Sequence, residues 1–187
     1  MQNSDIKYID FNFTSDVDSK IIEGLNEVNA LFYSLLYYKR NDLLKYTPYK
    51  VNVSELIENN QWTGGTCVAV EKDDGTCDLK LNFKKIAELE SFPLNSLTWV
   101  MLHEFRHKVQ LFDESLKSVL DIPNWKNFKE YMQKTTDKSE DMINHVFHEL
   151  NPAEVDANAF ATEMLGIKYL GNAFNITEET LQLLKNN

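Results

Sequence analysis

The first regular pattern of apolar positions lies between residues 15 and 38. Apolar side chains recur there every three or four residues, at Ile21, Leu25, Val28, Phe32 and Leu35. Residues with this spacing share one face of a helix, so the segment is expected to form a long amphipathic helix packed on a core. Thr47-Pro48 marks the end of the next segment, and the β-branched run YKVNV at 49–53 predicts a strand.

Residues 66–83, TCVAVEKDDGTCDLKLNF, favour a β-hairpin that turns at Asp74-Gly75. The two cysteines of the chain, Cys67 and Cys77, lie in this segment and would not face each other across the hairpin. We therefore expect free thiols. They also lack the second close pair of ligands that a structural zinc site needs.

The second half of the chain is predicted to be mainly helical. Asn95 or Ser96 is a suitable N-cap for a helix that runs to about Phe112, with a core face of Trp99, Leu102, Phe105, Val109 and Phe112. Further helices are expected from Ser139 to Leu150, from Ala153 to about Leu165 after the Asn151-Pro152 start signal, and from Thr177 to Leu184. Residues 114–137 show no decisive pattern. The mixture of elements predicts an α+β domain with a small antiparallel sheet.

Length and charge limit the class of protein. A chain of 187 residues suits one domain, so residues 1–187 are expected to form a single unit. A net charge of -10 argues against a nucleic-acid or anionic-membrane surface, since both require clustered Lys and Arg. No apolar run could cross a bilayer, and the first residues, MQNSDIKYID, lack the features of a signal peptide. A cytoplasmic location is therefore expected.

The segment HEFRH at 103–107 carries the chemistry that the sequence indicates most clearly. On a helix, His103 and His107 lie one turn apart on one face, where both ring nitrogens can bind one metal ion. Glu104 is next to this face and can accept a proton from a water on the metal. Zinc with an open coordination position lowers the pKa of such a water to about 7. The spacing therefore predicts a catalytic zinc site.

A third zinc ligand must come from elsewhere, and three carboxylates are candidates. The first is Asp113, because HEFRHKVQLFD resembles the metzincin motif, in which a glycine after the second histidine bends the chain toward a third ligand. Here Gln110 stands at the glycine position and would continue the helix. Glu154 lies in the first turn of its helix and shares a face with Ala157, Asn158 and Ala161, small residues that allow close helix packing. Glu154 could instead fold back onto Asn151 in a capping box. Asp156 is the third candidate, and Glu154 is favoured.

The pair of motifs, HEFRH followed by EVDANAFATEML, resembles the gluzincin zinc metallopeptidases and is especially similar to the ImmA/IrrE-type peptidases of bacteria and mobile elements such as phages. The resemblance implies a zincin-like fold, with His103, His107 and Glu154 as zinc ligands and Glu104 as general base. It also implies that Asn158 orients a ligand. The best-known members of that family cleave a repressor, so a protein or peptide substrate, such as a repressor, is implied.

The remaining histidines, His145 and His148, are three residues apart; one of them could stabilise the oxyanion, or both could be ordinary surface or packing histidines. We favour His148 because it is nearer to Glu154, while Tyr131 and Tyr169 are alternatives for this role. The function expected is hydrolysis of peptide bonds, with a substrate strand added to the hairpin edge near Asp78 to Phe83. The alternative is a metal-binding interaction module without catalytic activity.

Overall fold

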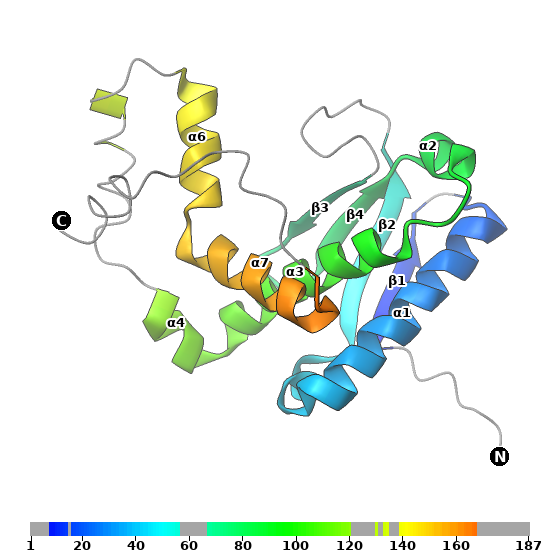
Figure 1. The fold of residues 1–187 in the computed structure, drawn as a ribbon, viewed down its shortest axis with the longest axis horizontal. Helices are drawn as coiled ribbons and strands as arrows, with labels where there is room; N and C mark the ends of the chain where they lie inside the picture. Colours follow the sequence, from blue (N-terminus) through cyan, green and yellow to red (C-terminus); the bar gives the residue numbers. More distant parts are fainter. Residues whose placement is uncertain are drawn as a thin grey trace.

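The computed structural model describes residues 8–14, 16–56, 67–120, 130, 133–134 and 139–167 (Figure 1). The helix expected at 177–184 and the alternative residues Tyr131 and Tyr169 lie outside these ranges. Within the described residues, four strands form one sheet and helices pack against it, so the chain has the α+β fold class that the sequence predicts.

The sheet has the strand order β1-β2-β4-β3. Its strands are β1 (Ile9–Phe13), β2 (Tyr49–Glu55), β3 (Cys67–Glu71) and β4 (Cys77–Leu81). Only β3 and β4, the expected hairpin, are antiparallel, because β1 pairs with β2 and β2 with β4 in parallel. The expectation of an antiparallel sheet is therefore wrong. A long helix connects β1 to β2 and returns the chain to the same end of the sheet, as parallel pairing requires.

The hairpin turn is where the sequence places it. The backbone N–H of Lys72 donates to the Thr76 carbonyl at 2.8 Å, and Gly75 adopts a positive φ of 76°. Cys67 pairs with Leu81 and Cys77 with Glu71, so the two cysteines do not face each other, and both are free thiols.

Within the described residues, the structure has the four predicted helices and three more at segments where no helix was predicted. They are α1 (Ser19–Lys39), the 3-10 helix η1 (Asn41–Tyr46), α2 (Phe83–Glu88), α3 (Leu94–Phe112), α4 (Glu114–Leu120), α6 (Glu140–Glu149) and α7 (Pro152–Leu165). Helix α3 begins before the expected caps Asn95 and Ser96, with Pro93 as its N-cap. Helix α7 has the expected start, since the Asn151 Oδ1 accepts from the Ala153 N–H at 3.0 Å and Pro152 follows.

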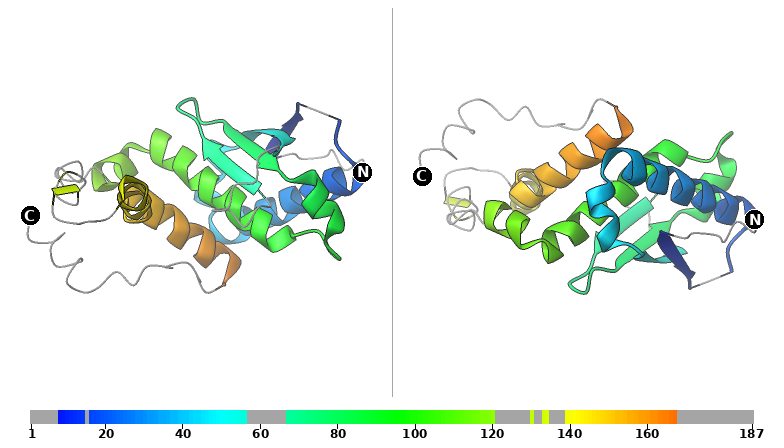
Figure 2. Two further views of the ribbon diagram at one scale, coloured as in Figure 1. Left: turned by 90° about the horizontal axis from the view of Figure 1, so that it is seen from above. Right: turned by 90° about the horizontal axis from the view of Figure 1, so that it is seen from below.

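One face of the sheet packs on α1 and α3, and α7 lies against α3 (Figure 2). Tyr49 and Leu79 of the sheet, Phe32 of α1 and Phe105 of α3 are all fully buried in this core. Phe32 and Phe105 meet edge to face with ring centroids 5.2 Å apart. Each such ring contributes roughly 1.5–3 kcal/mol by its burial. Helix α3 is therefore held from both sides, which fixes the segment that carries HEFRH.

The structure differs from the sequence prediction at one expected core residue and at the strand edge expected to bind the substrate. Phe112 is 50% exposed, and its ring lies against Gly75 in the hairpin turn instead of in the core. The strand expected to accept a substrate, near Asp78 to Phe83, is β4, which is paired on both sides by β2 and β3. Among the described strands, the unpaired edge on this side of the sheet belongs to β3.

Candidate metal centre

The HEFRH segment occupies the middle of α3, where the helix is covered by the sheet on one side and by α7 on the other. His103 and Glu104 are each only 8% exposed. Buried polar side chains require partners, so this concentration of polar groups needs an explanation. The partners come mainly from α7.

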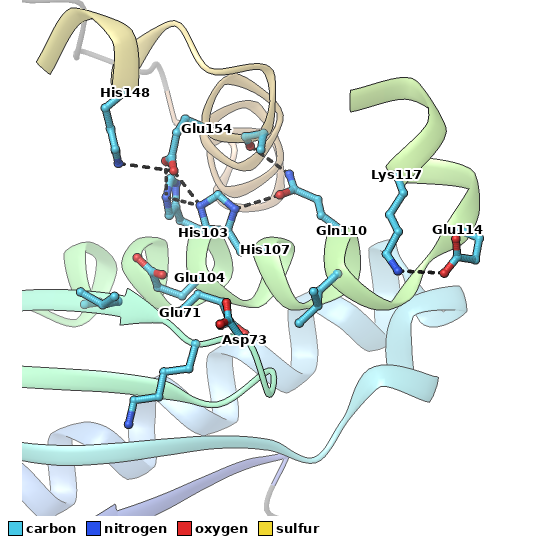
Figure 3. Close-up of a pocket in the computed structure, with 15 residues that line it drawn as sticks. Glu71, Asp73, His103, Glu104, His107, Gln110, Glu114, Lys117, His148 and Glu154 are labelled. Atoms are coloured by element: carbon cyan, nitrogen blue, oxygen red, sulfur yellow. Dashed lines mark hydrogen bonds and ion pairs between the residues drawn. The ribbon is translucent and has the colours of Figure 1, made fainter. Parts of the chain in front are cut away.

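Helix α7 brings Glu154 to the two histidines. Ala157 and Ala161, on the same face, are fully buried, and their small size allows α7 to approach α3 closely. The alternative role of Glu154 in a capping box is not observed. The backbone N–H of Asn151 donates to the His148 carbonyl at 3.0 Å, and the Glu154 carboxylate points toward the histidines instead (Figure 3).

The three side chains place one ligand atom each around a common point. The Nε2 atoms of His103 and His107 are 3.1 Å apart, and the Glu154 Oε2 lies 3.2 Å from the first and 3.4 Å from the second. Ligand atoms about 2.0–2.1 Å from a tetrahedral zinc ion stand about 3.3–3.4 Å apart. The triangle therefore has the size of one face of a zinc coordination tetrahedron, and these residues could hold a metal ion.

The charges of the three groups depend on one another. Burial opposes ionisation of Glu154, but its hydrogen bonds to His103 and His107 hold the pKa of the carboxyl well below its usual range. Burial lowers the pKa of His107, but the hydrogen bond and negative charge of Glu154 outweigh it and raise that pKa to about 9. A metal ion must displace the proton from His107 in order to bind, because a histidine ligand is neutral.

Glu104 lies beside this triangle without being part of it. Its carboxylate is on the side of α3 that faces β3, whereas Glu154 approaches the histidines from α7 (Figure 3). Burial raises the pKa of Glu104, and the neighbouring histidines reduce this effect. A carboxylate near a metal ion but outside the ligand set has the placement required of a general base.

A pocket opens over these residues. It runs between the β3 edge and the helices, with walls from residues 69–73 of the hairpin, His103, Glu104, His107, Gln110 and Leu111 of α3, Glu114 and Lys117 of α4, and His148, Ala153 and Glu154. The candidate ligands, Glu104 and His148 all line this pocket.

His148 lies at the end of α6, next to the candidate ligands. Its Nε2 is 3.4 Å from the Oε1 of Glu154, the carboxylate oxygen that the metal triangle does not use, and its side chain is 63% exposed. Asn158 lies one turn after Glu154 on α7 and is partly buried. Among the described residues, its side chain makes no hydrogen bond to His103, His107 or Glu154.

The two other carboxylate candidates for the third ligand have different partners. Asp113 ends α3 and accepts hydrogen bonds from the Tyr46 hydroxyl at 2.9 Å and the Ser115 hydroxyl at 2.6 Å. Asp156 receives two hydrogen bonds from Arg106, at 2.7 and 3.0 Å. Neither belongs to the group of ligand atoms that lie within 4.8 Å of one another.

Sequence reasoning missed two polar residues that the structure brings to the site. Gln110 accepts a hydrogen bond from the Nδ1 of His107 at 2.8 Å, although the sequence marks it only as a residue that continues the helix. Its position three residues after His107 was a usable signal. Glu71 lines the pocket from β3 and accepts from the Tyr49 hydroxyl at 2.8 Å, a contact that depends on strand pairing and has no local signal.

Comparisons with protein-family models, with curated proteins and with solved structures found no match to this chain. In the part of the chain that the structure describes, none of the helices has the length and apolar character needed to span a membrane. The function is therefore argued from the site itself.

Proposed function

We propose that this protein is a zinc-dependent peptidase of the gluzincin type, with His103, His107 and Glu154 as metal ligands and Glu104 as general base. The observation that carries the proposal is the triangle of ligand atoms with edges of 3.1, 3.2 and 3.4 Å, with a separate buried carboxylate beside it. A structural zinc site normally has four protein ligands, whereas a catalytic site has three and leaves one position open.

The residues divide the reaction between them. A zinc ion held by the three ligands would act as a Lewis acid and lower the pKa of a water to about 7. Glu104 accepts a proton from the water whose oxygen attacks the peptide carbonyl carbon. The same carboxyl then gives this proton to the amide nitrogen as the C–N bond breaks, which leaves a carboxylic acid and an amine, and the amine takes up the acid proton to give a carboxylate and an ammonium group. His148 lies at the rim of the pocket, where it donates a hydrogen bond to the oxyanion.

The substrate in this proposal is a protein or peptide that binds in an extended conformation. The β3 edge is unpaired among the described strands and lines the pocket through residues 69–71. A peptide added to this edge gains backbone hydrogen bonds and lies across the metal ligands. The sequence resemblance supports a cytoplasmic protein substrate, such as a repressor, in a bacterial or phage setting.

The test combines metal analysis with one matched substitution. The purified protein should contain about one zinc ion per chain, and His107→Ala should lose it. Glu104→Gln keeps the shape of the side chain and removes the base, so it should retain zinc and folding while hydrolysis falls by about two to four orders of magnitude. New protein termini produced in a bacterial lysate by the wild type, and not by Glu104→Gln, would identify substrates.

Each result leads to a different conclusion. If the zinc content is well below one ion per chain and His107→Ala does not change it, the proposed metal site is refuted. Cleavage that continues unchanged in Glu104→Gln would exclude the proposed base. Zinc-loaded protein that cleaves no protein in the lysate would favour the alternative function, a metal-binding interaction module.

A further inference from the structure

Gln110 is one of the few polar side chains buried between α3 and α7, with an exposed fraction of 7%. Its side chain contacts both helices. The Nε2 group donates to the Ala153 carbonyl at 2.9 Å and to the Asp156 Oδ2 at 2.8 Å, while the Oε1 faces the His107 Nδ1 at 2.8 Å.

These contacts leave one possible orientation for the amide. A backbone carbonyl can only accept, and both oxygens of Asp156 already accept from the guanidinium of Arg106, which can only donate. The NH2 group of Gln110 must therefore face Ala153 and Asp156, and its oxygen must face His107. The Nδ1 of His107 then carries a hydrogen, and in the neutral ring that binds a metal the Nε2 presents its lone pair to the metal position.

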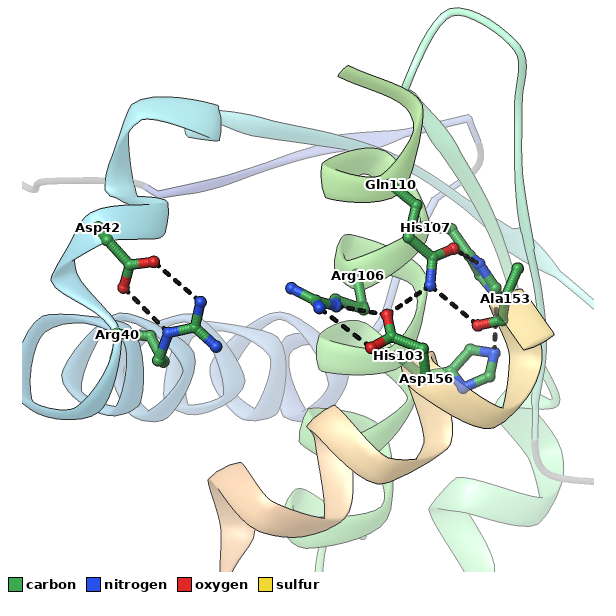
Figure 4. Close-up of polar contacts among 8 residues, drawn as sticks. All are labelled: Arg40, Asp42, His103, Arg106, His107, Gln110, Ala153 and Asp156. Carbon is green, nitrogen blue, oxygen red and sulfur yellow. Dashed lines mark hydrogen bonds and ion pairs between the residues drawn. The ribbon is translucent and has the colours of Figure 1, made fainter. Parts of the chain in front are cut away.

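We propose that Gln110 is a positioning residue that fixes the ring orientation and tautomer of His107 and is itself held by the Arg106–Asp156 pair. This inference rests on the proposed metal site. It assigns a function to a residue outside the ligand set and explains why a glutamine, an aspartate and an arginine are gathered at the α3–α7 contact (Figure 4).

His103 is held in a different way. Its Nδ1 is buried and has no hydrogen-bond partner among the described residues, and its ring stacks on Trp99 at 5.3 Å instead. The Trp99 indole N–H donates to the Thr162 hydroxyl at 3.2 Å. Helix α7 thus supports each histidine through one intermediate side chain, and of the two Nδ1 atoms only that of His107 has a hydrogen bond among the described residues. Loss of that hydrogen bond should weaken metal binding, as loss of such a partner generally does.

The experiment measures zinc affinity by competition with a chromogenic chelator. Gln110→Met keeps the volume and apolar stem but removes the acceptor, so its zinc affinity should fall by about 10- to 100-fold. Gln133→Met is the matched control, because Gln133 is exposed in the described part of the chain, and its affinity should not change.

A second readout does not require metal. In metal-free protein with 15N-labelled histidine, the Nδ1–H of His107 should exchange slowly in the wild type and in Gln133→Met, and this slowly exchanging Nδ1–H should be absent in Gln110→Met. Urea unfolding of each variant shows whether it is folded. Zinc affinity of folded Gln110→Met within twofold of wild type would overturn the inference while leaving the metal site intact. Wild type that retains the N–H signal but binds no zinc would overturn the proposed function and leave the positioning geometry standing.

Discussion

Replacing Arg106 with methionine should destabilise the protein more than any comparable change at a surface arginine. The Arg106 Nε and Nη2 donate to the two oxygens of Asp156 at 2.7 and 3.0 Å, and the side chains are 8% and 29% exposed. Removing one partner of a buried ion pair costs about 3–5 kcal/mol, because it leaves the other charge without compensation. Asp156 keeps some solvent contact and the Gln110 donor, so we expect a loss of about 3 kcal/mol.

The chain offers a closely matched control. Arg40 donates through its Nε and Nη2 to both oxygens of Asp42 at 2.9 and 2.8 Å (Figure 4). Both guanidinium groups also lie over the same ring, since Arg40 is 5.9 Å and Arg106 is 5.1 Å from the Phe160 centroid. The Arg40 pair differs in exposure, at 39% and 57%. Arg40→Met should therefore lose less than about 1 kcal/mol, as exposed ion pairs contribute little.

The assay is urea unfolding of metal-free wild type, Arg106→Met and Arg40→Met in the presence of a chelator. The unfolding midpoint should fall clearly for Arg106→Met, with the slope of the transition unchanged, so that the difference reflects stability. Equal losses for the two variants would refute the reasoning, because burial would then not determine the energy of the pair. A loss below about 1 kcal/mol for Arg106→Met would refute it as well.

Two further predictions concern other carboxyl groups. Glu154→Gln should greatly reduce the zinc content measured by elemental analysis. Asp113→Asn should retain zinc, because the Asp113 carboxylate is hydrogen-bonded to Tyr46 and Ser115. The reverse pattern would make Asp113 the third ligand. Burial raises the pKa of Glu71 from 4.5 to about 7, so this carboxyl contributes stability that is complete below pH 4.5 and is lost as the pH rises through 7. As the pH rises from 5 to 8, the free energy of unfolding of metal-free wild type, measured with urea, should fall by about 1–2 kcal/mol relative to that of Glu71→Gln. This value is reduced because the Glu71 side chain is partly exposed to solvent. A relative rise in the stability of wild type would contradict the prediction.

Local signals explain why the two site helices could be predicted from the sequence. The spacing of His103 and His107 and the Asn151-Pro152 start of α7 both depend on residues a few positions apart, and the structure has them as expected. Local spacing does not determine the choice between two roles for Glu154, as a cap or as a partner of the histidines. The distance from α7 to α3 decides this, and it results from the packing of whole helices.

Strand pairing was the part that the sequence could not determine. The hairpin of β3 and β4 is visible because its turn is local, but its free edge depends on which strand pairs with β2. Strand β1 has no motif of its own. Besides its pairing with β2, this strand is held by the Asn29 side chain, whose amide oxygen accepts from the Ile9 N–H at 3.0 Å and whose NH2 donates to the Ile9 carbonyl at 3.1 Å. Such contacts across 20 residues leave no periodic pattern.

The arrangement of α7 makes the proposed metal site and the helix packing parts of one unit. Glu154 and Asp156 are two residues apart on this helix: the first contacts both histidines directly, and the second holds the glutamine that contacts His107. A shift of α7 along α3 would therefore displace a ligand and the support of another ligand together. Because a metal ion that binds only the docked arrangement stabilises it by mass action, zinc binding and the docking of α7 should strengthen each other. The buried alanines at 157 and 161 permit this contact, so the sequence of α7 serves packing and chemistry through the same face.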